Sequence, residues 1–446
     1  MTTKIAGGEE LNEIVNSPSD IAEYIERFSK PNEERLFGIE YERLGVYRDT
    51  CRAIPFDNGV EKVLDTMAEQ SGWKRGLENG RIVYLERDGE SITLEPGGQT
   101  EYSSAPAHTV KELMKSARKA VNELDRAAEF HGIVFLGIGF HPFSKLDEIS
   151  FAPKKRYLFM APYLKKKGAL ALEMMKMTAG CQVALDYKNA NDAMKKLRAA
   201  SLVTPIAQAL FASSGIGGGK TLPVLDYRAS IWTQTDNARC NIPDFMMKAN
   251  SDIMEYVDWL LDMPLMFIEK NGNYYESDGV SLRSLMQKKK ITFYDVELAM
   301  TQAFPEVRLK RFIEIRSADS LQPALLPTVP CFWSSLIYGN LDEIFELLGK
   351  ISREDFFRMR EAAIQFGLKG KAGGRSIADW ADDLLNIAKK SCVCDGSLEK
   401  LRERAESKIT SAELAQRLLD EISDPAEFAE SWNSYGIDST PLKCDA

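Results

Sequence analysis

The most chemically distinctive stretch of the chain is Leu94–Glu101, LEPGGQTE, which holds two carboxylates on either side of a Pro-Gly-Gly turn. Side chains alternate in direction along an extended chain, so Gln99 and Glu101 point to the same side, and a tight turn brings Glu95 alongside them. One surface then presents several oxygen atoms. Such oxygen atoms are the ligands that Mg²⁺ takes in proteins.

A second acidic stretch, Gly38–Gly45, has the sequence GIEYERLG and places Glu40 and Glu42 on one face by the same alternation. Like charges this close repel each other unless a cation or an arginine lies between them. A solvated strand face would explain either stretch alone. The two stretches together indicate a metal and phosphate site.

Arg228 and Trp232 share a face if the segment Asp226–Asp236 is extended, as we expect. A planar guanidinium can hold a carboxylate through two hydrogen bonds, and an aromatic wall can exclude water from an amino-acid pocket. The alternative is a structural Arg–Asp pair over a core tryptophan. The substrate-binding interpretation is the one we favour.

The segment Val307–Asp319 reads as a strand with Glu314 and Arg316 on one face and Arg311 on the other, unless a bulge intervenes. A carboxylate and an arginine that alternate in this way suit a metal ion beside an anionic substrate. This strand is therefore a further candidate part of the site.

Basic residues open the helix that we expect after Ala152, in the segment Pro153–Tyr157 with Lys154 and Arg156. Amide groups at the N-terminus of a helix face outward and attract anions. The segment is consistent with contact to phosphate, and a solvated turn explains it equally well.

Two other motifs give weaker signals. Ser213–Thr221, SSGIGGGKT, is similar to a phosphate-binding P-loop, but that pattern requires a glycine where Ser214 stands. We expect a mobile surface loop instead, one that could close over the substrate. His141 precedes Pro142, a context more typical of a packed or surface histidine than of a catalytic base.

Composition limits the possible functions. With 446 residues and a net charge of −9, the chain lacks the basic excess of a general nucleic-acid binder. No apolar run approaches the ~20 residues needed to span a bilayer, and the N-terminus lacks an apolar signal segment, so we expect a cytoplasmic protein without a membrane partner. The seven cysteines are scattered without a CxxC pair, so no zinc site is expected.

Hydrophobic periodicity and turn residues predict alternating strands and helices. Two helical pieces are expected in 9–29, a hairpin with an Asp-Gly turn in 82–94, a helix with a capping box from Thr109, strands at 133–140, 181–187 and 264–268, helices at 191–211 and 252–263, and charged helices at 341–348, 354–366, 377–388 and 398–422. Gln182 lies on the polar face of its strand.

Several of these stretches resemble a known family in the same order along the chain. Leu94–Glu101 resembles the LEPGGQ-x-E signature of the plant-type glutamate–cysteine ligases, and Gly38–Gly45 resembles their first acidic strand. Further matches occur at Phe135–Phe140, Arg228–Asp236 and Phe304–Arg311. The resemblance covers roughly residues 34 to 340.

The family's fold implies an α+β protein with a curved, mostly antiparallel sheet that forms a funnel-shaped active site backed by helices, as in glutamine synthetase. We expect residues 1–346 to form the catalytic body with its N-terminal helices, and residues 347–446 to form a helical cap packed on the same body. The resemblance implies a ligase that uses ATP and Mg²⁺ to form γ-glutamylcysteine from glutamate and cysteine through a γ-glutamyl phosphate, in glutathione biosynthesis.

The resemblance, with the patterns above, assigns a role to each candidate residue. The expected Mg²⁺ ligands are Glu40, Glu42, Glu95, Glu101, Gln182 and Glu314. The expected catalytic and substrate-binding residues are Arg228 and Arg316, with Trp232 and Met266 also in the substrate pocket. The expected contacts to ATP are Arg308, Arg311, Lys154 and Arg156. The partners are small molecules, and the protein is expected to be a monomer or a homodimer.

Departures from the family pattern affect the acceptor. Members of the plant type commonly have His where this chain has Tyr41 and Ala229, Asn in place of Ala184, and Tyr in place of Met266. The acidic residues are kept, so we expect handling of ATP and Mg²⁺ to be kept while recognition of the acceptor amine has shifted. The alternatives are a γ-glutamyl ligase acting on a different amine, or a non-catalytic protein that retains the fold.

Overall fold

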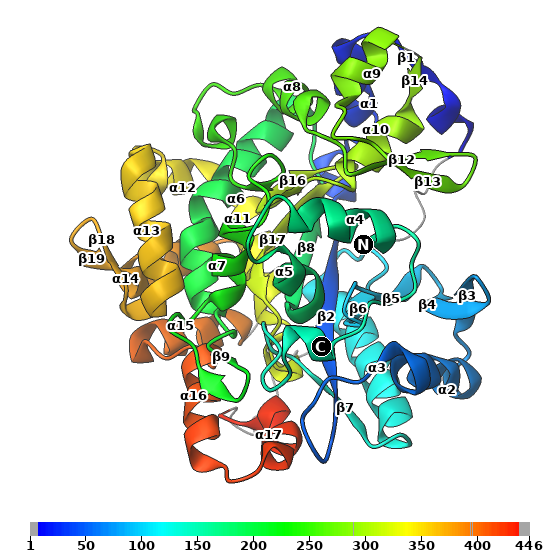
Figure 1. The fold of residues 1–446 in the computed structure, drawn as a ribbon. Helices are drawn as coiled ribbons and strands as arrows, with labels where there is room; N and C mark the ends of the chain where they lie inside the picture. The colour runs from blue at the N-terminus through cyan, green and yellow to red at the C-terminus, as the bar shows by residue number, and fades with distance from the viewer. Residues whose placement is uncertain (1–7, 289, 393, 395, 437–446) are drawn as a thin grey trace.

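A computed structural model describes residues 8–436 except 289, 393 and 395, and its centre is an antiparallel sheet (Figure 1). Within the described residues the sheet has nine strands in the order β16-β17-β8-β2-β6-β5-β4-β3, and β7 pairs with the far half of β2. The strands are β2 (Phe37–Tyr47), β3 (Lys74–Glu78), β4 (Arg81–Arg87), β5 (Glu90–Leu94), β6 (Thr100–Ser103), β7 (Ile133–Leu136), β8 (Gly180–Leu185), β16 (Val307–Leu309) and β17 (Ile313–Asp319).

The long strand β2 determines which side chains meet. It pairs with β8 through Phe37–Tyr41, with β6 through Glu40–Arg43 and with β7 through Leu44–Tyr47. In this register Glu42 lies opposite Glu101 of β6, and Glu40 lies opposite Gln182 of β8. Cross-strand partners lie about 5 Å apart, so acidic residues distant in sequence become neighbours.

Helices enclose the sheet and form most of the core. The 22-residue α6 (Ala190–Phe211) is buried along nearly its whole length and packs on β17, while α11 (Thr328–Ile337) packs on β8. In Figure 1 the helices α12 to α16 lie on one side of the molecule, and β3, β4, α2 and α3 lie on the other. The other helices of seven or more residues are α1 (Pro18–Glu26), α2 (Glu61–Ser71), α3 (Val110–Glu129), α4 (Tyr157–Lys165), α5 (Ala171–Met177), α7 (Tyr227–Thr233), α8 (Ile253–Asp262), α9 (Leu282–Lys288), α10 (Phe293–Met300), α12 (Leu341–Leu348), α13 (Arg353–Phe366), α14 (Ile377–Lys389), α15 (Ser397–Ser407), α16 (Ser411–Glu421) and α17 (Pro425–Ser431).

Short strand pairs complete the fold. They are β1 (Ile14–Val15) with β14 (Ile291–Thr292), β9 (Ile216–Gly217) with β10 (Lys220–Thr221), β11 (Cys240–Asn241) with β15 (Phe304–Pro305), β12 (Phe267–Lys270) with β13 (Asn273–Glu276), and β18 (Lys371–Ala372) with β19 (Arg375–Ser376). Within the described part of the chain, no helix is both long and apolar enough to cross a membrane.

The α+β fold with a mostly antiparallel sheet is confirmed, and several local predictions are confirmed with it. The β4–β5 turn has positive φ at Asp88 and Gly89, as a tight Asp-Gly hairpin requires. Helix α3 begins at a capping box formed by Thr109 and Glu112. Pro205 lies inside α6, as expected.

Tertiary context overrides other local predictions. The segment expected to be extended around Arg228 is helix α7, which begins where the Asp226 carboxylate accepts a hydrogen bond from the backbone N–H of Ala229. The run 307–319 is a hairpin of β16 and β17, and the run 398–422 is two helices separated at Lys408, where φ is +55°. The loop at 213–221 contains the β9–β10 hairpin, with Ser214 buried.

The predicted domain boundary between residues 346 and 347 falls inside α12 (Leu341–Leu348). Beyond it, Leu418, Phe428 and Trp432 share an apolar core with residues of β2 and β7. The helices predicted to form a cap are therefore packed on the catalytic body, but the division of the chain into these two units stays a prediction. Cys444 and Met1–Gly7 lie outside the described residues.

Candidate active site

A cavity opens over the sheet between β2, β6, β8 and the helices α4, α5 and α7. Acidic residues form one part of its lining, the acidic wall, and arginines also line the cavity. Its lining residues are Glu42, Glu95, Pro96, Gln99, Glu101, Arg156, Tyr157, Met160, Met174, Met175, Thr178, Gln182, Arg228, Trp232, Phe304 and Arg316. The cavity therefore brings together residues from seven parts of the chain.

Glu42 and Glu101 form the centre of the acidic wall, on adjacent strands. The carboxylate of Glu42 accepts a hydrogen bond from the backbone N–H of Gly180 at 2.6 Å. Desolvation, with the charges of Glu101 and Glu95, raises the pKa of Glu42 to about 8. A buried carboxylate whose pKa is raised by neighbouring carboxylates favours a bound cation.

Glu40 lies one step along β2, on the same face of the sheet but outside the cavity lining. Desolvation and the charge of Glu101 raise its pKa to about 7. Its Oε2 atom is buried and has no hydrogen-bond partner within the described residues. An orphaned carboxylate oxygen next to Glu101 fits a hard divalent ion.

The Pro-Gly-Gly turn holds Glu95 in the wall. Gly98 adopts φ +83°, and a Cβ on Gly97 would lie 2.2 Å from the carbonyl oxygen of Lys176. Gln99, which the sequence suggested as a further oxygen donor, has a structural role instead. Its Oε1 accepts from the N–H of Gly97 at 2.8 Å, and its Nε2 donates to the carbonyl of Thr178 at 2.8 Å.

Arg316 faces the acidic wall from β17. Its Nη1 donates to Gln182 Oε1 at 2.6 Å and to Glu314 Oε2 at 3.2 Å, and its guanidinium lies 5.7 Å from the centre of the Trp232 ring. Gln182 in turn donates to Glu42 at 3.4 Å. Gln182 thus connects Arg316 to the acidic wall, and its role as a metal ligand stays a prediction.

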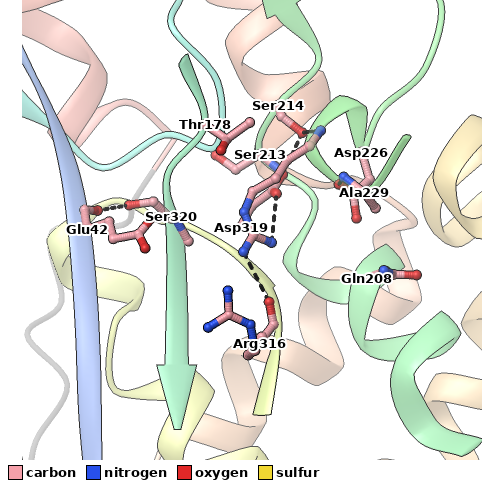
Figure 2. Close-up of polar contacts among 12 residues, drawn as sticks. Glu42, Thr178, Gln208, Ser213, Ser214, Asp226, Ala229, Arg316, Asp319 and Ser320 are labelled. Carbon is pink, nitrogen blue, oxygen red and sulfur yellow. Dashed lines mark hydrogen bonds and ion pairs between the residues drawn. The ribbon is translucent and has the colours of Figure 1, made fainter. Parts of the chain in front are cut away.

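Arg228 is held by a buried polar cluster behind the cavity. Its Nη2 donates to the carbonyl of Arg316 at 3.1 Å, and its Nη1 lies 4.0 Å from the Asp319 carboxylate. Asp319 also accepts from the backbone N–H of Ser213 and the hydroxyl of Ser214, both at 2.7 Å. Figure 2 shows Asp319 beside both serines, with Arg316 further along the same strand.

Two carboxyl groups of this cluster, Asp226 and Asp319, are both buried, and their pKa values are both raised. Burial raises the pKa of Asp319 to about 6, and burial with the Asp319 charge raises the pKa of Asp226 well above its ordinary value. Asp319 is therefore the charged partner of Arg228, and Asp226 serves as the cap of α7. Figure 2 also shows the Ser320 hydroxyl joined to the backbone oxygen of Glu42, which ties the cluster to β2.

Arg156 and Lys154 occupy the turn before α4, which begins at Tyr157 and not at Pro153. Arg156 lines the cavity and donates to the Tyr157 hydroxyl at 3.2 Å. Lys154 points away, and its ammonium donates to the carbonyl of Leu94 at 2.6 Å. Burial and the neighbouring Arg156 lower the pKa of Lys154 to about 7, so only Arg156 is placed to contact a ligand in the cavity.

Glu314 is surrounded by cations in this structure, and its role as a metal ligand stays a prediction. The β16–β17 hairpin sets it opposite Arg308, whose Nη2 lies 2.5 Å from its carboxylate, and Lys310 Nζ lies at 3.0 Å. With Arg316 it has three cationic partners, and Arg308 leads the cations that hold its pKa well below the ordinary value despite burial. Glu314 and Arg308 therefore position Arg316, and Arg308 does not line the cavity.

Two further predicted residues lie elsewhere. Arg311 pairs with Glu297 at 2.7 Å and stacks near Phe28, away from the cavity lining. Met266 is buried in the core, where its backbone N–H donates to Gln302, so the structure does not place it in a substrate pocket. A local strand pattern cannot distinguish such residues from site residues, because cross-strand neighbours decide which face is lined.

Sequence reasoning missed several residues at the cavity and behind it. Tyr157, Phe304 and the methionines of α4 and α5 form its apolar wall, and Asp319 with Ser213 and Ser214 supports Arg228. The methionines read as core residues, since helical spacing alone gives no sign of a cavity. Asp319 ends the arginine-bearing strand, which was the one available signal for it.

A larger cavity, of about 1180 Å³, opens beside the first, between α8, α13 and the segment Ala238–Phe245. None of the predicted metal ligands lines it. A small pocket that includes Trp232, Glu306 and Asn241 lies between the two and shares lining residues with both. The acidic cavity is the one whose side chains suit phosphate and metal chemistry.

Known proteins match this chain over most of its length. Residues 36–424 match the family described as Glutamate-cysteine ligase family 2. Glutamate–cysteine ligase A of Oryza sativa subsp. japonica is 35% identical over 379 residues, which are 83% of this chain and 77% of the relative. The enzyme of Solanum lycopersicum is 34% identical over 412 residues, covering 90% of this chain and 79% of the relative.

A solved structure has the same fold. Glutamate–cysteine ligase from Francisella tularensis, in complex with AMP, aligns with a TM-score of 0.53 at 12% identity and covers 93% of this chain and 92% of its own. The resemblance identified in the sequence is confirmed by the family match. The predicted cytoplasmic location is contradicted, because the relatives from rice, tomato and Arabidopsis thaliana all carry a chloroplast location in their names.

Proposed function

The chain belongs to Glutamate-cysteine ligase family 2, and from that premise we propose that it joins L-glutamate to L-cysteine with conversion of ATP into ADP and phosphate. An oxygen of the glutamate γ-carboxylate attacks the γ-phosphorus of ATP, and the bond to ADP breaks. The cysteine amine then attacks the carbonyl carbon of the γ-glutamyl phosphate. Phosphate leaves, the amine gives up a proton, and γ-glutamylcysteine is released.

The observation that supports this proposal is that carboxylates and arginines line one cavity. Glu42, Glu95 and Glu101 form the acidic wall, and Arg228 and Arg316 line the same cavity. A ligase of this kind must hold a triphosphate and two anionic amino acids in line. A cavity with both charges can bind metal-complexed phosphate at its carboxylates and the substrate carboxylates at its arginines.

The acidic wall fits Mg²⁺. Glu42, Glu95 and Glu101 would hold the ion, with Glu40 beside them, because burial among neighbouring carboxylates raises the pKa of Glu40 and Glu42, and Glu40 has a buried oxygen without a partner within the described residues. When bound, Mg²⁺ supplies positive charge that offsets the charge of the phosphoryl oxygens.

The arginines bind and orient the reactants. Arg228 and Arg316 each present a guanidinium to the cavity, and each is fixed from behind by a carboxylate, Asp319 and Glu314 respectively. A fixed guanidinium can hold a substrate carboxylate in a defined direction. Arg156 lies nearer to Glu95 and is the one remaining arginine of the lining, which makes it our candidate for a phosphate contact.

Apolar side chains protect the activated intermediate. Trp232, Phe304, Tyr157 and the methionines surround the polar centre. An acyl phosphate hydrolyses if water reaches it, so a wall of this kind favours transfer to the amine over loss to water.

The proposed partners are the small-molecule substrates that bind in this cavity. The protein's state as a monomer or a homodimer stays a prediction, which light scattering can test.

Phosphate release tests the proposal directly. The purified chain is incubated with ATP, Mg²⁺ and glutamate, with cysteine or one of a panel of other amines, and the product is identified by mass spectrometry. We expect γ-glutamylcysteine with one phosphate per product. Glu42→Gln provides the inactive control, and absence of phosphate release with every amine would reject the ligase assignment.

A second candidate is a γ-glutamyl ligase with a different acceptor amine. The supporting observation is that Ala184 and Ala229, where the plant type carries Asn and His, offer no polar side chain beside Glu314 and Arg228. The same panel separates the two candidates. A higher kcat/KM for another amine than for cysteine favours the second.

A further inference from the structure

Three cysteines from two separate parts of the sequence lie close together next to helix α11. Cys331 lies on α11, and Cys392 and Cys394 lie between α14 and α15. Their three Sγ atoms all lie within 4.8 Å of one another, and the Sγ atoms of Cys331 and Cys392 are 3.4 Å apart. The cluster could not be predicted from the sequence, because Cys331 lies 61 residues before Cys392 and the cysteines lack the CxxC spacing.

The spacing of these sulfur atoms suits a shared metal ion. A Zn–S bond of about 2.3 Å sets sulfur atoms about 3.8 Å apart in a tetrahedral site and about 4.0 Å apart in a planar trigonal one. The Cys331–Cys392 separation of 3.4 Å and the upper limit of 4.8 Å for the cluster leave room for these values. A disulfide needs a separation of about 2.05 Å, so Cys331 and Cys392 are not joined by one.

The surroundings favour thiolate at the centre of the cluster. The backbone N–H of Cys394 donates to Cys392 Sγ at 3.2 Å. A hydrogen bond from a backbone N–H to sulfur favours the thiolate, which is the form of cysteine that binds a soft cation.

The three cysteines differ in their exposure to solvent. Cys331 is fully buried, whereas Cys392 and Cys394 are partly exposed to solvent. An ion can therefore enter past the exposed pair and reach the buried thiol. Three protein ligands leave one position for water or for an external ligand.

We propose that Cys331, Cys392 and Cys394 bind one thiophilic cation of the d¹⁰ class, with Zn²⁺ as the test ion. The site joins α11, which packs on β8 and β2, to the α14–α15 segment beyond the predicted domain boundary. Binding there holds the C-terminal helices against the strands that carry Gln182 and Glu42. The site is separate from the acidic cavity, whose oxygen ligands suit Mg²⁺.

Zinc titration of the reduced, chelator-treated full chain tests the proposal. We expect one Zn²⁺ per chain in competition with a chromophoric chelator, and a thiolate charge-transfer band when Cd²⁺ replaces Zn²⁺. That band reports sulfur ligands, so binding to the acidic cavity does not produce it. The readout is metal content, so it does not depend on the proposed ligase activity.

Variants of the exposed pair keep the test decisive. Cys392→Ser and Cys394→Ser should each weaken zinc binding by at least about 100-fold. This loss is larger than the loss expected from changing a residue that contacts a metal ligand but not the metal ion. Cys51→Ala, which removes a buried thiol outside the cluster, should leave binding unchanged. Equal zinc affinity in the wild type and both Ser variants, or no zinc binding by the wild type, would overturn the proposal. A Cys331–Cys392 disulfide formed under mild oxidation in a chain that binds no metal would also overturn it.

Discussion

Substitutions at Arg228 can distinguish a structural role of this arginine from a role in substrate binding. Its side chain is buried, and its guanidinium lies 4.0 Å from the Asp319 carboxylate while it faces the cavity. Replacing it in Arg228→Met leaves Asp319 buried without its cation. Loss of one partner from a buried ion pair costs about 3–5 kcal/mol, so we expect the free energy of unfolding to fall by that amount.

A second substitution removes the orphaned charge. In Arg228→Met/Asp319→Asn the amide carbonyl can still accept from the backbone N–H of Ser213 and the hydroxyl of Ser214. Most of the lost stability should therefore return. Catalysis should not return, because the two charge-assisted hydrogen bonds to a substrate carboxylate are absent. At the lower limit of about 1.5 kcal/mol for each bond, the loss of transition-state stabilisation is about 3 kcal/mol. The value of kcat/KM should therefore fall by roughly 150-fold.

Two measurements decide the outcome. Urea denaturation gives the free energy of unfolding for the wild type, the single variant and the double variant. Steady-state kinetics with glutamate and cysteine varied in turn, at saturating ATP, give kcat/KM for each amino acid. If the double variant regains both stability and kcat/KM, Arg228 is a structural partner of Asp319 and the substrate role is wrong.

Three other changes have defined outcomes. Glu42→Gln removes one central carboxylate of the acidic wall, so it should lower kcat by at least about 100-fold at saturating Mg²⁺. Glu86→Gln, at an exposed position, should not lower kcat in this way. Equal kcat values for the wild type and Glu42→Gln would contradict a metal role. Burial lowers the pKa of His141 to about 4, so the unfolded chain binds a proton that the folded chain excludes below pH 6.5. The free energy of unfolding should then fall by up to about 3 kcal/mol between pH 6.5 and pH 4, and His141→Gln, compared by urea denaturation, should lack this part of the slope. Thr109→Ala should cost about 1 kcal/mol by removing the cap of α3, seen as a lower Tm, and an unchanged Tm would refute the contribution of the cap.

Local pattern was enough for much of the fold. The Asp88–Gly89 hairpin, the capped start of α3 and the alternation of Glu40 and Glu42 follow from residue type and period, which act over a few positions. The helical form of Asp226–Asp236 could not be found in this way. Its start depends on a cap that forms within a buried cluster containing Asp319, far along the chain.

The sequence by itself determined which chemistry is present, because the acidic strand, the Pro-Gly-Gly turn and the arginines are read from residue type and order. Only the tertiary structure decided which of these groups are available. Cross-strand pairing placed Glu42 against Glu101 but surrounded Glu314 with Arg308, Lys310 and Arg316. Helix packing brought Cys331 to Cys392 and Cys394. Charge and proximity are properties of neighbours in space, and a one-dimensional pattern specifies those neighbours only within a strand or a turn.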